Sequence, residues 1–283
     1  PSRGLGDVYK RQILNGTTNY ILSQMTETGV NYANALADAQ KQGFAEADPT
    51  NDVCGFDAAR KLAILSSIGF RANVTFDDVL VEGIEKIDKS DIQYAKDMGY
   101  TIKLLTVALR QENGIALNVY PAFLPDNHPL SSVKGAYNAI YVTGNIVDDI
   151  MFYGRGAGAL PTASAVMGDV ISTAQHILNG STGTGMIMTD TKRIPFYSSL
   201  KLQNSYYFRL DVDDVTGVLS QIAAAFAEND ISICEVVQKR KTKGLAELVL
   251  ITELASRESI LQVEKGLQVL PCMRKVANVI RVM

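Results

Sequence analysis

Apolar residues in the first hundred positions recur every three or four residues, with short polar loops between the repeats. This spacing is typical of helices with one buried face. It predicts helices that end near residues 25 and 69, another over 32–42 and a short one over 90–98. Asn15, Thr17 and Thr18 stand where the first helix begins, and their side chains are good helix N-caps.

From residue 102 the pattern changes to that of strands. Strands are predicted over 102–109 and 115–120, and the Gln-Glu-Asn-Gly segment between them is a strong hairpin signal. A second pair is predicted over 139–144 and 148–153. We therefore expect an α+β fold with an open, mostly antiparallel sheet and helices packed on one face. The other face would carry exposed apolar residues and suit a contact between subunits.

A Gly/Ser/Thr-rich connector over 181–204 separates this unit, residues 13–180, from a second domain over 205–283. The second domain is predicted to run strand 206–212, helix 217–228, strands 231–240 and 246–252, helix 257–267 and strand 276–282. That order is the βαββαβ of ferredoxin-like folds. Residues 1–12 show no helix or strand period, so we expect them to be a non-native leader outside the fold.

Composition narrows the classes of function. The chain has 283 residues and a net charge of −3 with no long basic run, which argues against nucleic acid as a partner. Three scattered cysteines form no C-x-x-C pair and only two histidines are present, so neither disulfides nor a metal site is predicted. No apolar run reaches the roughly 18 residues of a membrane span. The expectation is a soluble, cytoplasmic protein without membrane contacts.

Carboxylates crowd the loop before the central helix, where Glu46, Asp48 and Asp52 lie within seven positions. Their mutual repulsion requires a ligand, a cation or bulk water nearby. Calcium binding of the EF-hand type fails, because the sixth position of such a loop would be Val53 rather than glycine.

Asp57 and Lys61 follow at helical spacing on a helix whose other residues are mostly small or apolar. One interpretation is a surface ion pair worth about 0.3–0.5 kcal/mol. The other is that Lys61 points into a cleft, because its neighbours leave little room for a polar face. A lysine sheltered from solvent gives up its proton more readily, and it can act as an acid beside a substrate held by Asp57 and Glu46.

The segment Gly-Arg-Gly-Ala-Gly-Ala at 154–159 follows a predicted strand and precedes a predicted helix over 163–178. It fits G-x-G-x-x-G/A, so a Rossmann phosphate loop is one interpretation. The strand with an acidic end that such a fold needs about 20 residues later is missing. The simpler interpretation is a glycine loop whose backbone N–H groups approach a ligand at a helix N-terminus.

These segments resemble the homoserine dehydrogenase family, through Gly-x-x-Glu-x-Asp-Pro at 43–49, Gly-x-Asp-x-x-x-Lys at 55–61, Asn-Gly-Thr-x-Asn-Tyr at 15–20 and the glycine loop. The resemblance implies interconversion of homoserine and aspartate semialdehyde with NAD or NADP, in which Lys61 carries the proton of the substrate oxygen. It also implies the other site residues: Glu46, Asp57, Asp52 and Thr17 for the substrate, and Gly43, Glu46, Gly158 and Gly156 for the cofactor. Many relatives carry Asp-Asp where this chain has Asn51-Asp52, which leaves Asp52 as the better candidate.

Residues 211–219 resemble the turn of an ACT domain, a regulatory module that binds amino acids where two copies meet. The resemblance implies a homo-oligomer and an amino-acid effector, with threonine as the first candidate. The positions implied for the effector are Gly217, Val218, Asn229 and Ile231. Thr216 stands where the family often has proline. A ferredoxin-like assembly lobe without a ligand is the alternative interpretation.

The family's nucleotide-binding half and its monovalent-cation ligands are expected before Ile13, so we expect this polypeptide to be inactive alone. A second class of function stays open, a non-catalytic, amino-acid-binding oligomerisation module. The sequence also leaves open whether the cofactor is NAD or NADP and whether the oligomer is a dimer or a tetramer.

Overall fold

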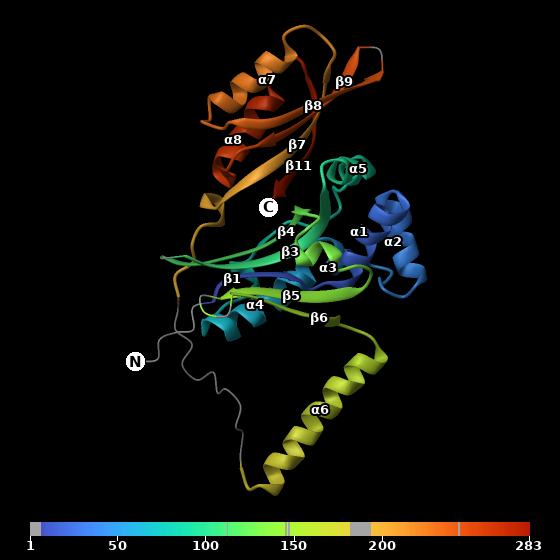
Figure 1. The fold of residues 1–283 in the computed structure, drawn as a ribbon, viewed down its shortest axis with the longest axis vertical. Helices are drawn as coiled ribbons and strands as arrows, with labels where there is room; N and C mark the ends of the chain where they lie inside the picture. Colours follow the sequence, from blue (N-terminus) through green and yellow to red (C-terminus); the bar gives the residue numbers. More distant parts are fainter. Residues whose placement is uncertain (1–6, 112, 145, 147, 182–193, 243) are drawn as a thin grey trace.

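The computed structural model describes residues 7–111, 113–144, 146, 148–181, 194–242 and 244–283. Its strands join in one sheet of order β6-β5-β1-β3-β4-β11-β7-β9-β8, which runs through two lobes (Figure 1). The predicted α+β class, with an open and mostly antiparallel sheet, is confirmed. The joining of both lobes by a single sheet was not predicted.

The sheet of the first lobe holds β1 (Asp7–Ile13), β3 (Tyr100–Gln111), β4 (Gly114–Pro125), β5 (Tyr137–Gly144) and β6 (Asp148–Arg155). These strands pair antiparallel, and both predicted hairpins form. The short strand β2 (Leu80–Val81) adds parallel to β4.

Four helices of the first lobe lie close to the predicted positions, and a fifth, of four residues, lies in the segment predicted as a loop. They are α1 (Gly16–Thr28), α2 (Tyr32–Lys41), α3 (Thr50–Val53), α4 (Phe56–Phe70) and α5 (Lys89–Asp97). Leu22 of α1 and Leu62 of α4 are fully buried in one cluster with Leu104 of β3, so the helices cover one face of the sheet. Asn15 caps α1 as predicted, because its Oδ1 accepts from the Thr18 N–H at 2.8 Å.

Strand β1 corrects one prediction. Residues 7–12 were predicted to lie outside the fold, but they pair with β3 on one side and β5 on the other. Lys10 lies opposite Ala108 and Val142, and both Lys10 and Gln12 are buried. Polar residues at buried positions hid the strand from pattern analysis. That residues 1–12 are non-native stays a prediction.

The second face of this sheet is less exposed than predicted. Leu105 and Val107 are buried there with Leu130, which lies in a short 3₁₀ segment at Pro129–Ser132. Exposed apolar side chains lie instead on the edge strand β6, where Phe152 is 64% exposed. A subunit contact through the sheet would therefore fall near β6, and it stays a prediction.

The second lobe confirms the βαββαβ order. It runs β7 (Gln203–Asp213), α7 (Val218–Ala227), β8 (Ile233–Thr242), β9 (Leu245–Thr252), the two-residue β10 (Ala255–Ser256), α8 (Arg257–Gln268) and β11 (Met273–Val282). Phe208 of β7 packs on Phe226 of α7, and both lie with Ile260 of α8 in a separate apolar cluster. This lobe therefore has a core of its own.

The two lobes meet where β11 pairs parallel with β4. Beside this pair, Asp91 of α5 is fully buried and accepts hydrogen bonds from three residues of the second lobe. The donors are Arg209 Nε at 2.7 Å, Tyr207 Oη at 3.1 Å and Asn278 Nδ2 at 2.8 Å. A buried polar network thus fixes α5 against the second lobe.

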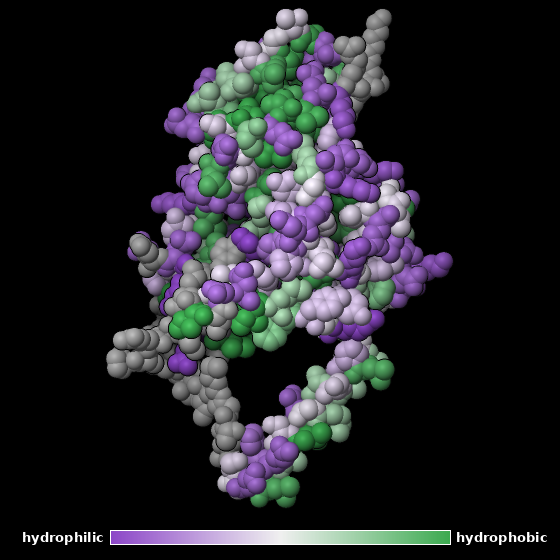
Figure 2. All heavy atoms as spheres, viewed as in Figure 1, coloured by the Kyte–Doolittle hydropathy of each residue, from purple (hydrophilic) through white to green (hydrophobic). Residues whose placement is uncertain are grey.

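Helix α6 (Ala159–Leu178) projects away from the first lobe (Figure 1), and none of its residues is buried. Apolar side chains follow its length in Figure 2. Leu160, Met167 and Leu178 are 83%, 54% and 85% exposed. Within the part of the chain that the structure describes, neither α6 nor any other helix has the length and apolar character needed to cross a membrane.

Candidate functional site

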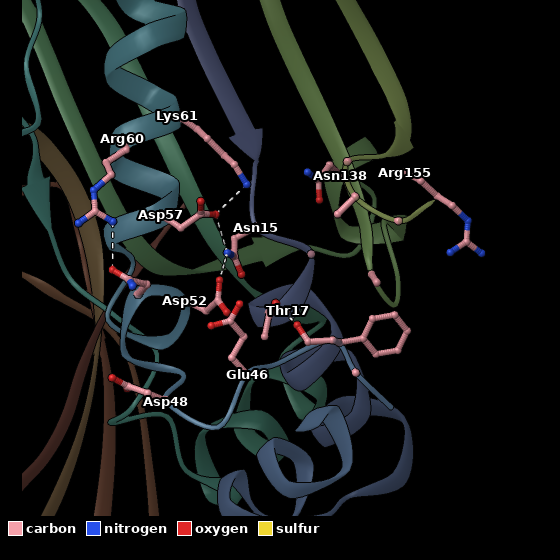
Figure 3. A pocket seen from close by; sticks show the side chains of 18 residues that line it. Asn15, Thr17, Glu46, Asp48, Asp52, Asp57, Arg60, Lys61, Asn138 and Arg155 are labelled. Atoms are coloured by element: carbon pink, nitrogen blue, oxygen red, sulfur yellow. Dashed lines mark hydrogen bonds and ion pairs between the residues drawn. The ribbon is translucent and has the colours of Figure 1, made fainter. Parts of the chain in front are cut away.

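A hydrogen-bonded chain of side chains begins at the N-cap of α1. The Nδ2 of Asn15 donates to Asp52 Oδ1 at 2.6 Å and to Asp57 Oδ2 at 2.8 Å (Figure 3). Its Oδ1 accepts from the Thr18 N–H. Both N–H bonds of one neutral amide therefore hold two carboxylates together. This arrangement places Asp52, from the end of α3, beside Asp57, from the first turn of α4.

Lys61 continues this chain. Its Nζ lies 2.7 Å from Asp57 Oδ2 and donates to the Leu14 carbonyl at 3.2 Å. The prediction that Lys61 is sheltered from solvent is wrong for this chain, because its side chain is 46% exposed and that of Asp57 is 31% exposed. An ammonium has three N–H donors, so two of them are used and one remains for a ligand.

These groups line a cavity of about 580 Å³. Every residue predicted for catalysis, substrate or cofactor lies on its wall: Thr17, Gly43, Glu46, Asp52, Asp57, Lys61, Gly156 and Gly158. They come from α1, the loop after α2, the α3–α4 segment and the loop between β6 and α6. The fold thus brings together four segments that are far apart in the sequence, whereas their individual roles stay predictions.

Glycine conformations shape the cavity wall. Gly43 and Gly158 have φ angles of 76° and 119°, which other residues rarely adopt, and a Cβ added to Gly43 would point into open space. Gly156 leaves room for a neighbour, because a Cβ there would lie 2.0 Å from Asn138 Nδ2. The loop leads into α6, and the next described strand is β7 of the second lobe, which is inconsistent with an independent Rossmann unit.

The other acidic-loop residues have structural partners. The hydroxyl and the backbone N–H of Thr50 donate to Asp48 and hold the pKa of this carboxyl below its usual value. Asn51 accepts from Arg60 Nη1 at 3.0 Å. Among the residues that the structure describes, there is no cluster of three or more His, Cys, Asp or Glu side chains suited to a metal ion.

Sequence analysis missed several residues on the cavity wall: the carboxylate-bridging role of Asn15, and also Arg60, Asn138 and Arg155. Asn15 was singled out only as a helix cap, which its Oδ1 alone explains. Asn138 lies on β5 with no motif around it, so no local signal could have found it. Arg155 lies within the glycine loop, stacks over the Tyr137 ring and points away from Lys61 in Figure 3.

The predicted effector residues of the second lobe fall into two groups. Gly217, with φ of 90°, and Val218 begin α7, while Asn229 and Ile231 follow its end. Ten helical residues span about 15 Å, so one chain does not bring these groups together. Asn229 is also used locally, because its Nδ2 donates to the Ala225 carbonyl.

Comparison with known proteins agrees with both lobes. The sequence profile of the family described as homoserine dehydrogenase matches residues 10–171, and that of the ACT domain matches residues 206–272. Homoserine dehydrogenases from Mycobacterium bovis and Bacillus subtilis are 43% identical over 279 residues and 40% identical over 273 residues. Each match covers 95% of this chain and 63% of the relative, so the chain spans about 63% of their length.

A solved structure of a homoserine dehydrogenase from Thiobacillus denitrificans is similar over 98% of this chain, with a TM-score of 0.90 and 34% sequence identity. The match covers 64% of that chain. A structure of the Staphylococcus aureus homoserine dehydrogenase covers the same 98% with a TM-score of 0.72 and 32% identity.

Proposed function

Because the chain belongs to the homoserine dehydrogenase family, we propose that its cavity carries out the interconversion of L-homoserine and L-aspartate 4-semialdehyde with NAD or NADP. The observation that supports this most directly is the placement of Lys61, which is held by Asp57 and the Leu14 carbonyl and keeps one N–H for a ligand. The glycine loop lies on the same cavity.

Lys61 is the catalytic residue of this proposal. When bound, NAD or NADP would supply or accept the hydride at the substrate carbon. Lys61 Nζ donates a proton to the carbonyl oxygen during reduction and accepts it from the hydroxyl during oxidation. Asp57 keeps the lysine in place through the 2.7 Å ion pair, and Asn15 in turn keeps Asp57 in place. General acid help of this kind is usually worth about 100- to 10,000-fold in rate.

The acidic wall suits the ammonium group of an amino acid. Glu46, Asp52 and Asp57 line the cavity and can attract this group, while Thr17 stands at the start of α1 beside them. The Thr17 hydroxyl donates to the Phe44 carbonyl at 2.6 Å, which leaves its oxygen as an acceptor for the substrate.

The described residues fit one end of a nicotinamide cofactor. Gly43 and Gly158 leave the cavity wall free of side chains, and Gly156 and Glu46 lie on the same wall. These groups would hold the nicotinamide end beside Lys61. Because the chain spans about 63% of the length of its relatives, we propose that the polypeptide of residues 1–283 has little activity by itself.

Substrate recognition offers the sharpest test of the reaction. The protein at its native length should oxidise homoserine with NAD or NADP, and it should oxidise 4-hydroxybutanoate, which lacks the ammonium group, far more slowly. Glu46→Gln should reduce this discrimination. Equal rates with both alcohols, or none with homoserine, would contradict the proposed function. If the polypeptide of residues 1–283 alone oxidised NADPH with aspartate semialdehyde as the substrate, this would contradict only the proposal that it has little activity by itself.

The second lobe supports a regulatory proposal. Its ACT match and its βαββαβ order favour an amino-acid effector, with threonine as the first candidate, bound between two copies. Gly217 and Val218 of one copy and Asn229 and Ile231 of the other would then form opposite walls. Threonine should raise the melting temperature of the wild type and not that of Gly217→Val. A melting temperature that threonine leaves unchanged would favour the assembly role alone.

A further inference from the structure

Asn138 of β5 lies between the two glycine-containing motifs of the cavity. A Cβ on Gly156 would lie 2.0 Å from its Nδ2, and a Cβ on Gly16 would lie 3.5 Å from its Oδ1. The side chain thus fills the space that the glycine of the loop leaves open. A residue with a side chain at 156 could fit only if Asn138 moved.

The amide of Asn138 also reaches the lysine through one shared acceptor. Its Nδ2 donates to the Leu14 carbonyl at 3.2 Å, and Lys61 Nζ donates to the same oxygen at 3.2 Å. A carbonyl oxygen has two lone pairs, so both donors can be accommodated at once. In Figure 3, Asn138 and Lys61 approach the end of β1 from opposite sides of the cavity.

The acceptor atom of Asn138 has no comparable partner. Among the described residues, its Oδ1 is buried and accepts no hydrogen bond. Turning the amide over would place that oxygen against the Leu14 carbonyl, so the hydrogen bond settles its orientation. A buried acceptor without a partner costs stability, and the hydrogen bond to Leu14 together with the close fit against Gly156 offsets this cost at Asn138.

We propose that Asn138 is a positioning residue for proton transfer: it fixes the Leu14 carbonyl, and through it Lys61, at a set distance from the glycine loop. This proposal rests on the proposed function, because it takes Lys61 as the group that moves the proton. A displacement of about 1 Å of such a group can cost about 100-fold in rate. Asn138 therefore affects the turnover step more than substrate binding.

The test is a double-mutant cycle in the protein at its native length, with homoserine oxidation as the assay. Asn138→Ala should lower kcat by about 10- to 100-fold while KM for homoserine changes less than about threefold. In a Lys61→Ala background the same substitution should lower kcat by less than about twofold, because the group that it positions is gone. Equal effects in both backgrounds would overturn the proposal.

Asn138→Asp separates the hydrogen bond from the shape of the side chain. The carboxylate is isosteric with the amide but cannot donate to Leu14, so the variant should be as slow as Asn138→Ala near neutral pH. Its kcat relative to the wild type should rise as the pH falls and the carboxyl regains an O–H donor. A ratio that does not depend on pH would overturn the role of this hydrogen bond.

Asn118→Ala is the matched control. Asn118 is a buried asparagine of β4 whose Nδ2 has no partner among the described residues, and it does not line the cavity. Asn118→Ala should leave kcat unchanged in both the wild-type and the Lys61→Ala background. Crystal structures give a readout without catalysis: Lys61 Nζ should shift by about 1 Å or more in Asn138→Ala and stay in place in Asn118→Ala.

The two proposals fail in different ways. A wild type that does not oxidise homoserine, with the Lys61 shift still present in Asn138→Ala, would contradict the proposed function and with it the role in proton transfer, and would support only the placement of Lys61 by Asn138. An active wild type in which Lys61 keeps its place in Asn138→Ala would overturn the positioning role alone.

Discussion

The Asp57–Lys61 pair of the cavity and the Asp91–Arg209 pair between the lobes have the same N–O separation, 2.7 Å. Their surroundings differ. The side chains of the first pair are 31% and 46% exposed, whereas those of the second are 0% and 9% exposed. Water screens the first pair, so it adds little to stability and its proton stays accessible. The second pair lies out of water, and removing one partner would strand a buried charge.

The two pairs also differ in their hydrogen-bond partners, in line with their different exposure to water. In the cavity, Lys61 has one carboxylate and one carbonyl, which leaves a donor for a ligand. Between the lobes, Arg209 contacts both Asp91 and Glu247, and Glu247 also accepts from Tyr94 at 2.8 Å. Burial together with these carboxylates raises the pKa of the Tyr94 and Tyr207 hydroxyls, so both stay protonated as donors. The same residue types therefore serve reactivity at one place and rigidity at the other.

The largest expected effect is that of Lys61→Ala on activity. Loss of the proton donor should lower kcat for homoserine oxidation by about 100- to 10,000-fold. The melting temperature should barely change, because an exposed pair contributes only about 0.3–0.5 kcal/mol. The control is Lys239→Ala. It removes another exposed lysine, whose Nζ lies 3.7 Å from Asp97 Oδ2, and it should leave kcat unchanged. A large loss of stability without loss of kcat would remove the contrast between the two pairs.

Arg209→Met should have the opposite signature, with a loss of about 3–5 kcal/mol in the free energy of unfolding because Asp91 and Glu247 stay buried without their cation. Urea denaturation measures this loss. Arg274→Met is the matched control, since Arg274 pairs with Asp213 at 2.6 Å while 62% exposed, and it should cost less than about 1 kcal/mol. Similar losses in both variants would show that burial does not determine how much an ion pair contributes to stability in this protein.

Lys103 extends the comparison to a buried cation with neutral partners. It is 2% exposed and donates to Asn19 Oδ1 and to the Val133 carbonyl. Burial lowers the pKa of Lys103 from 10.5 to about 8. Between about pH 8 and 10 the unfolded chain holds a proton that the folded chain has lost, so raising the pH should stabilise the fold by about 2–3 kcal/mol. Unfolded tyrosines begin to ionise near the upper end of this range and oppose the gain, so the effect of Lys103 is measured as a difference from a variant that lacks it.

The measurement is urea denaturation of the wild type and Lys103→Met at pH 7.5 and 10. Between these two pH values the free energy of unfolding of the wild type should rise by about 2–3 kcal/mol relative to that of the variant. Lys239→Met, which changes a lysine that is 53% exposed, should keep the gain. A gain of the same size in Lys103→Met would show that groups other than Lys103 cause it.

The smallest effect is expected at the rim of the cavity. Asn51→Asp would give the exposed Arg60 a charged partner in place of the amide that now accepts its hydrogen bond at 3.0 Å. The new pair should change the free energy of unfolding by less than about 1 kcal/mol, and 1 M salt should remove the change. Denaturation at two salt concentrations checks this, and a larger effect that resists salt would show that the rim is drier than its exposure indicates.

Much of the fold was predictable because it depends on local patterns. The 3.6-residue period located α1, α2 and α4, the Gln-Glu-Asn-Gly turn located the β3–β4 hairpin, and the order of elements predicted the second lobe. Motif spacing likewise selected Lys61, Asp57 and the glycine loop, which the structure places on one cavity. These signals lie within a few residues of one another along the chain, so they can be found without the fold.

What only the tertiary structure decided is which distant groups meet. Strand β1 escaped prediction because Lys10 and Gln12 are buried polar residues, and a single strand becomes stable only when neighbours on both sides pair with it. Asp91 and Arg209 are 118 positions apart, and Asn138 and Leu14 are 124 apart. Sequence determined which side chains could donate, accept or carry charge. Burial and contact then determined what each of them does, because both depend on long-range packing that no local pattern encodes.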